Sequence, residues 1–373
     1  MKCGILILTL LLFLSACNDD RSSEPSPAIG LLDESLIICN EGNWQSDNGQ
    51  LSYLDAMTGE LTNKWFRSVN GFKLGDTPND IIQINDTLIA ISVNWSNIIQ
   101  YINPDGTACG ATENVPNNRR LCTDGQFLYV TSFAHICGSQ TYEKGYVAKI
   151  DVASLRVVAS CGVGWEPDGI ALYDGRLYIA NSGGYAFSES HDYETSISIV
   201  DAATMTKIGD IMTDCPNLSG PISRAGKFLC INSNGNGSVA SPKTIILNCE
   251  TDEFSLLDFP SNLNASDGEL FYTIGSVVEN STGESRSHIH TINPSTMEVG
   301  NEICSPEVTS LIGSLEKPYD LYISPYTGSF YCTYARNFTS AGLLYGYSSM
   351  GEQLFEPQKL YINPAHILAL PRR

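Results

Sequence analysis

Short runs of alternating apolar residues, separated by turn residues, recur along most of the chain. The segment from Pro167 to Asn181 shows the pattern most clearly, because two such runs flank Asp174-Gly175. Asp-Gly supplies the positive φ of a tight hairpin at low cost, so the segment predicts two antiparallel strands. Two further strands are predicted at Ile197 to Asp201 and Lys207 to Ile211. Together they form a unit of four strands.

The hairpin occurs six times in all. Its other copies run from Pro78 to Ser92, Asn117 to Ser132, Leu218 to Asn232, Pro260 to Ile274 and Pro318 to Tyr334. Successive starts lie 39 to 58 residues apart, which suits a four-stranded blade of about 40 to 50 residues with variable loops. The predicted third strand of five blades also ends in the same way, with an aliphatic residue followed by Asp or Asn: Leu54-Asp55, Ile102-Asn103, Ile150-Asp151, Val200-Asp201 and Ile292-Asn293.

The two ends of the repeat region complete each other. Leu36 to Asn40 matches a second strand that lacks its first, and Pro364 to Leu370 matches a first strand that lacks its second. We therefore predict an all-β fold, a seven-bladed β-propeller over residues 31–373, closed by one C-terminal and three N-terminal strands. Ile367 to Leu370 is expected beside Leu36 to Cys39, which leaves no free edge at the seam.

The N-terminus carries a different pattern. Lys2 precedes the apolar run Ile5 to Phe13, which is followed by Leu14-Ser15-Ala16-Cys17. The run is too short to span a bilayer, and small residues before a cysteine are typical of a lipobox. We predict a lipoprotein signal peptide over residues 1–16 with lipid attached to Cys17, an ordinary secretory signal being the alternative. Residues 17–30 are acidic or rich in Ser and Pro, which predicts a flexible tether.

Composition narrows the range of functions. The formal net charge of −20 would repel phosphate backbones, so nucleic acid is a poor partner. Five cysteines fall in predicted strands and are interpreted as small apolar core residues, with no disulfide pair evident from spacing: Cys39, Cys122, Cys230, Cys249 and Cys332. No nucleophile, zinc or phosphate-loop motif is present, and the pair His288 and His290 suits a solvated strand better than a metal site. We therefore expect a binding protein with no cofactor and no metal, not an enzyme.

In a propeller, the loops between second and third strands emerge on the same rim as the connections between blades, and function usually lies there. Three of the four tryptophans map to this rim: Trp44, Trp95 and Trp165. Loops 133–144 and 183–194 are longer than a blade needs. Arg119, Arg120, Asp168 and Tyr319 are assigned to the connections between blades. The full set of candidate ligand-binding residues is Trp44, Trp95, Arg119, Arg120, Phe133, His135, Trp165, Asp168, Asn181, Tyr185, Tyr319, Arg336 and Asn337.

The repeat resembles that of known propellers. Glu166-Pro167-Asp168-Gly169-Ile170-Ala171 followed by Leu177-Tyr178-Ile179-Ala180-Asn181 is similar to the YncE-like, YVTN-type repeats of extracytoplasmic bacterial proteins. More narrowly, three segments resemble the BtuG family of Bacteroidetes surface lipoproteins: Asn40-Glu41-Gly42-Asn43-Trp44, Arg119 to Gly125, and Asn181 to Phe187 with His191-Asp192-Tyr193-Glu194.

The narrower resemblance implies a function. That family captures cobamides, which include vitamin B12, and passes them to an outer-membrane TonB-dependent transporter. It implies a lipid-anchored protein exposed on the outer membrane, and Asp19-Asp20 resembles surface-export signals of the same phylum. The composition of the rim suits a corrinoid, with aromatic walls, Asn and Asp for amides and Arg for the phosphate. A surface protein that binds glycan or protein remains the main alternative, and a propeller hydrolase or lyase a weaker one.

Overall fold

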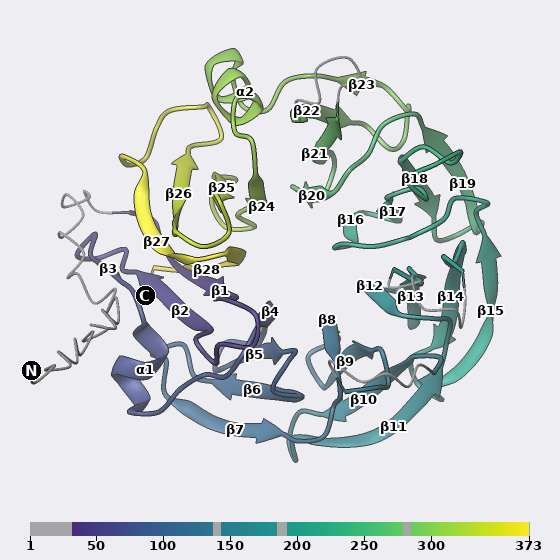
Figure 1. The fold of residues 1–373 in the computed structure, drawn as a ribbon, viewed down its shortest axis with the longest axis horizontal. Coiled ribbons are helices and arrows are strands. Elements are labelled where there is room, and N and C mark those ends of the chain that lie inside the picture. Colours follow the sequence, from purple (N-terminus) through teal and green to yellow (C-terminus); the bar gives the residue numbers. More distant parts are fainter. Residues whose placement is uncertain (1–31, 137–142, 185–191, 279–284, 373) are drawn as a thin grey trace, which may run out of the picture.

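Seven four-stranded antiparallel sheets surround a central axis as the blades of a propeller (Figure 1). The computed structural model describes residues 32–136, 143–184, 192–278 and 285–372. From the axis outward, blade 1 consists of β28 (Pro364–Pro371), β1 (Glu34–Asn40), β2 (Gln50–Leu54) and β3 (Leu61–Thr62). The predicted all-β, seven-bladed fold is confirmed.

The other six blades follow the chain in order. Blade 2 has β4 (Pro78–Asn85), β5 (Leu88–Val93), β6 (Ile98–Ile102) and β7 (Ala108–Thr112); blade 3 has β8 (Asn118–Thr123), β9 (Phe127–Ser132), β10 (Tyr146–Asp151) and β11 (Arg156–Gly162). Blade 4 has β12 (Pro167–Tyr173), β13 (Arg176–Asn181), β14 (Ser196–Asp201) and β15 (Thr206–Met212); blade 5 has β16 (Ser223–Ala225), β17 (Phe228–Ser233), β18 (Lys243–Asn248) and β19 (Glu253–Leu257). Blade 6 has β20 (Leu263–Ser266), β21 (Phe271–Val278), β22 (Ser285–Ile292) and β23 (Val299–Gly300); blade 7 has β24 (Pro318–Ile323), β25 (Phe330–Tyr334), β26 (Ala341–Tyr347) and β27 (Gln358–Ile362).

The ring closes inside blade 1. β28 pairs antiparallel with β1, with Ile367 opposite Ile38 and Leu370 opposite Ser35, as the two incomplete repeats predicted. A polar clasp reinforces the seam, because the buried Glu34 carboxylate accepts hydrogen bonds from Tyr331 Oη at 2.7 Å and Thr327 Oγ1 at 2.8 Å. These side chains therefore bond blade 7 to blade 1, in addition to the pairing of β28 with β1 that closes the ring.

The predicted hairpins are confirmed, with two differences in length. Asp174 and Gly175 both have positive φ, 44° and 73°, as the turn between β12 and β13 requires. The inner strands β16 and β20 begin only at Ser223 and Leu263, later than the predicted starts at Leu218 and Pro260. A propeller channel needs only one short inner strand from each blade. In blades 5 and 6 an irregular segment can therefore precede that strand.

The two faces of the ring differ in which connections they carry. Each inner strand starts at the face that also holds the loops between second and third strands, as the pairing of Pro78 with Val93 and of Val93 with Ile98 shows. We call this the upper face. The turns between first and second strands, and between third and fourth strands, form the lower face. β1 therefore begins at the lower face, where the folded chain starts.

Two helices accompany the two shortest outer strands (Figure 1). α1 (Trp65–Asn70) follows β3, and Trp65 is buried with its ring stacked 4.5 Å from that of Tyr53. α2 (Pro306–Gly313) follows β23 and contacts β22. Its N-cap Ser305 accepts a hydrogen bond from Val308 N, and proline stands at the first helical position. Neither helix was predicted.

The cysteines of the described chain are free thiols. Cys39, Cys230 and Cys332 are fully buried inside strands, as predicted, whereas Cys122 in β8 is only partly buried. Cys249 is buried but lies one residue beyond β18, not inside it. No helix in residues 32–136, 143–184, 192–278 and 285–372 is long and apolar enough to cross a membrane.

Candidate functional site

Two tryptophans from neighbouring blades meet on the upper face. Trp44 lies in the loop between β1 and β2, and Trp95 lies in the loop between β5 and β6. Their ring centroids are 5.0 Å apart at an interplanar angle of 77°, an edge-to-face contact. Trp44 remains 64% exposed. Such an exposed aromatic pair presents a large apolar surface to solvent at low conformational cost.

A second aromatic pair lies beside it, on blade 7. Tyr319 and Phe338 are in contact, with centroids 5.7 Å apart, and Lys317 Nζ lies 4.6 Å from the Phe338 ring. Tyr319 donates a hydrogen bond of 2.5 Å to Glu41 Oε2, and burial raises the pKa of that carboxyl. Blades 7 and 1 are therefore joined across the upper face by aromatic and acidic side chains.

On blade 3, next to blade 2, the upper face carries a cation on an aromatic ring. Phe133 and His135, which follow β9, are both buried, and their rings are 6.2 Å apart. Arg119 Cζ lies 5.1 Å from the centroid of the Phe133 ring. A guanidinium over a ring face is held in place by electrostatic attraction to the ring quadrupole.

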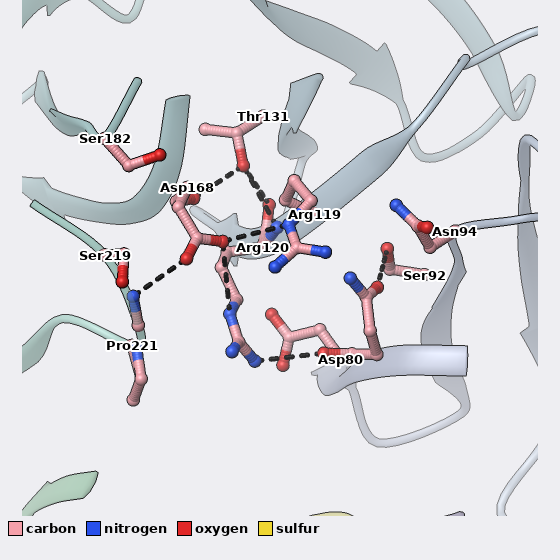
Figure 2. A network of polar contacts seen from close by, with 12 residues as sticks. Asp80, Ser92, Asn94, Arg119, Arg120, Thr131, Asp168, Ser182, Ser219 and Pro221 are labelled. Carbon is pink, nitrogen blue, oxygen red and sulfur yellow. Dashed lines mark hydrogen bonds and ion pairs between the residues drawn. The ribbon is translucent and has the colours of Figure 1, made fainter. Parts of the chain in front are cut away.

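Two adjacent arginines converge on one carboxylate at the channel mouth, which we define as Arg119, Arg120 and Asp168 (Figure 2). Asp168 Oδ1 lies 3.1 Å from Arg119 Nε and 3.8 Å from Arg120 Nε. Its other oxygen accepts a hydrogen bond of 2.8 Å from Gly220 N. The arginines belong to β8 and Asp168 to β12. Their assignment to the connections between blades is therefore wrong, as is that of Tyr319, which lies in β24. They line the inner wall because the inner strands begin at Asn118, Pro167 and Pro318, within the predicted hairpins, so these residues belong to strands and not to the connections.

An aspartate near the start of three inner strands bonds to the next blade. Asp80 Oδ2 accepts from Leu121 N at 2.7 Å, Asp168 Oδ2 from Gly220 N at 2.8 Å, and Asp320 Oδ2 from Ile367 N at 2.9 Å. These carboxyls share a Pro-Asp or Pro-x-Asp sequence at the head of their blades. They stabilise the ring of inner strands and place acidic groups in the channel.

Arg120 reaches across this ring. Its Nη1 donates to the carbonyl oxygen of Asn79 at 3.0 Å and contacts His366 Nε2 on β28. His366 Nδ1 in turn lies 3.8 Å from Asp320 Oδ1. Below this contact, a cavity of about 310 Å³ lies in the channel, with Asp80, Asn264, Asp320 and His366 among its lining residues. Blades 1, 2, 3 and 7 therefore share one polar network.

Burial and charge set the protonation of this network. Burial would raise the pKa of Asp168, but Arg119 and Arg120 together outweigh it and hold the pKa below its usual range. Burial raises the pKa of Asp80 to about 6 and that of Asp320 to about 8. Burial, assisted by the two arginines, lowers the pKa of His366 well below its usual range. These shifts favour the uncharged forms of Asp320 and His366.

The remaining candidate residues differ in how far a bound molecule can reach their side chains. Asn181 is fully buried, and its amide bonds to Gly164 N, Ser196 and Ser198, so a bound molecule cannot reach it. Trp165 is half-buried, and its backbone N donates to Glu194 Oε1. Arg336 and Asn337 are exposed in the loop after β25; the Asn337 side chain accepts from Thr339 N and Ser340 N and so supports its own loop. Tyr185 lies outside the described residues.

Sequence reasoning missed Glu41, Asp80, Asp320 and His366. The repeated aspartate after proline was visible at three blade starts, and it is the signal that could have indicated Asp80 and Asp320. No sequence pattern around His366 indicates a site residue, because His366 lies near the C-terminus, far in sequence from Arg120. Among the residues that the structure describes, no three His, Cys, Asp or Glu side chains are grouped so that they could hold a metal ion.

Comparisons with known proteins place the fold but not the function. No family model and no curated protein matches the sequence. A quinonprotein alcohol dehydrogenase-like protein of Bacteroides thetaiotaomicron has a TM-score of 0.59 at 12% identity, covering 90% of this chain and 78% of that chain. AztD of Citrobacter koseri has a TM-score of 0.51 at 10% identity, covering 90% and 98%. Hydrazine synthase of Kuenenia stuttgartiensis has a TM-score of 0.53 at 15% identity, covering 72% and 76%. At such identities the likeness shows the β-propeller fold alone.

Proposed function

We propose that the protein captures cobamides on its upper face. The observation that carries the proposal is the group of aromatic side chains on the upper face of blades 1, 2, 3 and 7, with Arg119 over the Phe133 ring. Trp44 with Trp95, and Tyr319 with Phe338, form two aromatic pairs on blades 1, 2 and 7. The resemblance of the segments that contain Trp44 and Arg119 to the BtuG family points to the same ligand.

The chemistry of a corrinoid suits this surface. The corrin ring is broad and flat, so exposed aromatic rings can pack against it with little loss of side-chain entropy. Amide groups fringe the ring, and the nucleotide loop carries one phosphate. Arg119 is partly exposed and is the better placed of the two arginines to meet an anion, since Arg120 is engaged with Asn79 and His366. A charge-assisted hydrogen bond to phosphate would be stronger than a neutral one.

The proposal includes anchoring and transfer. We propose that lipid on Cys17 holds the protein at the outer membrane surface and that a TonB-dependent transporter receives the ligand. The N-terminal pattern and the family resemblance support this part. The folded chain begins on the lower face, so the proposed site lies on the opposite face from the start of the fold. We propose a binding role and no catalysis, because the arginines and carboxyls of the channel mouth already bond to one another.

Retention of cyanocobalamin tests the proposal. The purified protein is mixed with cyanocobalamin and passed through a desalting column, and visible absorbance is measured in the protein fraction. A protein that scavenges a scarce nutrient dissociates slowly, so the colour should stay with it. Trp44→Ala on the upper face should reduce retention, and the matched control Phe254→Ala on the lower face should not. Colourless wild-type protein would reject cobamide capture and favour a glycan or protein ligand for the same aromatic rim.

A further inference from the structure

Tyrosines fill the lower part of three interfaces between blades. Tyr129 of β9 donates to the carbonyl oxygen of Ala202 in blade 4 at 3.3 Å, and Tyr178 of β13 donates to that of Cys249 in blade 5 at 3.0 Å. Tyr331 of β25 donates instead to the side-chain carboxylate of Glu34 in blade 1, at 2.7 Å. Each ring is almost fully buried. The three tyrosines take the same register position in their second strands, Tyr129 opposite Lys149, Tyr178 opposite Ile199 and Tyr331 opposite Gly346.

Blade 5 has no tyrosine at this position, and neither do blades 1 and 2, which have Ile37 and Ala90 there. Phe228-Leu229-Cys230 stands where blade 4 has Arg176-Leu177-Tyr178, and the registers agree, since Cys230 pairs with Ile246 as Tyr178 pairs with Ile199. The carbonyl group that a tyrosine would reach belongs to Pro294, which occupies the position of Cys249 in the next blade. The equivalence follows from the turns, because Asp252 N bonds to Asn248 O as Met297 N bonds to Asn293 O.

A cavity occupies this interface. It measures about 630 Å³ and opens on the lower side of blades 5 and 6, with Phe228, Ile246, Phe254, Pro294 and Met297 providing its apolar walls. A second cavity of about 400 Å³ shares Phe228 and Pro294 with it. No ring reaches Pro294 from Cys230, which is fully buried and lines neither cavity. We call the two cavities together the lower groove.

The mouth of the lower groove is acidic. Glu253 lines the larger cavity and Glu269 the smaller; both side chains are exposed, and neither carboxylate has a partner among the residues that the structure describes. Of the other charged lining residues, Asp252 is paired with Arg176 at 3.1 Å and Lys227 is paired with Glu250 at 2.6 Å. Unpaired carboxylates beside an apolar hole favour a cationic group next to an apolar one.

We propose that the lower groove binds a partner protein through an aromatic side chain flanked by lysine or arginine. The molecule itself indicates the occupant, because a tyrosine from the same chain fills the equivalent space at three other interfaces. A partner's ring would pack between Phe228 and Met297, and a tyrosine hydroxyl could donate to the Pro294 carbonyl oxygen. Basic neighbours of that ring would meet Glu253 and Glu269. This surface lies on the opposite face from the proposed cobamide site and is independent of it.

Methyl NMR of methionine-labelled protein tests the proposal. Met297 lines the lower groove, whereas Met205 occupies the same turn position in blade 4 and is buried in a filled interface, so it is an internal control. The probe is the peptide acetyl-Gly-Lys-Tyr-Lys-Gly-amide at millimolar concentration. We expect a saturable shift of the Met297 signal and none of the Met205 signal. Replacing the tyrosine by alanine, or both lysines by glutamates, should weaken the response at least tenfold.

Two variants localise the effect. Cys230→Tyr places a tyrosine at the register position of Tyr178 and should abolish the Met297 response to the peptide. Glu253→Lys changes only an exposed side chain and should reverse the charge preference, so that the peptide with glutamates binds at least as well as that with lysines. An absent Met297 shift, an equal response to the alanine peptide, or full binding by Cys230→Tyr would each overturn the proposal. Saturating cyanocobalamin should leave the Met297 titration unchanged.

Discussion

Deleting residues 364–373 removes the strand that closes the ring. β28 carries Ile367, Leu368 and Leu370, which are 4%, 8% and 6% exposed. Burying a large aliphatic side chain stabilises a fold by about 1.5 to 3 kcal/mol, so these three contribute about 5 to 9 kcal/mol. The deletion also removes the pairing with β1 and the hydrogen bond from Ile367 N to Asp320. Because a whole domain is stable by about 5 to 15 kcal/mol, the truncated chain should be largely unfolded.

Urea unfolding followed by circular dichroism measures this effect. The full chain should show a cooperative transition, and the chain truncated after Asn363 should show none or one shifted to much lower urea concentration. The matched control is a chain truncated after Pro371, which loses the exposed Arg372 and the last residue but keeps β28. This control should unfold like the full chain. A truncation after Asn363 with an unchanged midpoint would refute the closure of the ring by β28.

Three further predictions concern the anchor, the site and the channel. Cys17→Ser should move the protein from the membrane fraction to the soluble fraction, because a short hydrophobic stretch without lipid cannot hold it; full retention on membranes would reject the lipobox. Arg119→Ala and Trp165→Ala should each weaken cyanocobalamin binding by about 1 to 3 kcal/mol in calorimetric titration, and wild-type affinity in both would exclude this rim. Burial raises the pKa of Asp320 from 3.8 to about 8. Between about pH 4 and pH 8 the folded state therefore retains a proton that the unfolded chain releases, so the free energy of unfolding falls as pH rises through this range. Asp320→Asn keeps an acceptor for Ile367 N, and urea unfolding should find it more stable than wild type at pH 8.5 and similar at pH 4; the opposite trend would contradict the assignment.

The fold could be predicted from the sequence because its determinants are local and repeated. Each blade carries its own turn residues and its own alternation of apolar side chains, so six hairpins and the closing strand were found without contact information. α2 was not predicted, although it has a local signal, since Ser305-Pro306-Glu307 is a typical helix start. The shortness of β16 and β20 had no such signal.

The site was predicted less completely because its contacts join distant parts of the chain. The rim position of Trp44 and Trp95 was predicted from their loops, and the two rings do meet there; Tyr319 lies in β24 instead, and its neighbour Phe338 was not a candidate. The bonding of Arg120 to His366 links residues from opposite ends of the fold, and no local pattern encodes it. Asn181 matched a loop motif, yet its amide is used inside blade 4, because a residue at the end of an inner pair of strands faces the blade interior.

The position of a bound cobalt atom tests the central claim most directly. Crystals grown with cyanocobalamin, measured at the cobalt absorption edge, give an anomalous difference map in which the metal marks the ligand. We expect one strong peak per molecule above the channel mouth on the upper face, within reach of Trp44 and Arg119. A single peak on the lower face, or a map without any cobalt peak from crystals soaked at saturating ligand, would contradict cobamide capture at this rim.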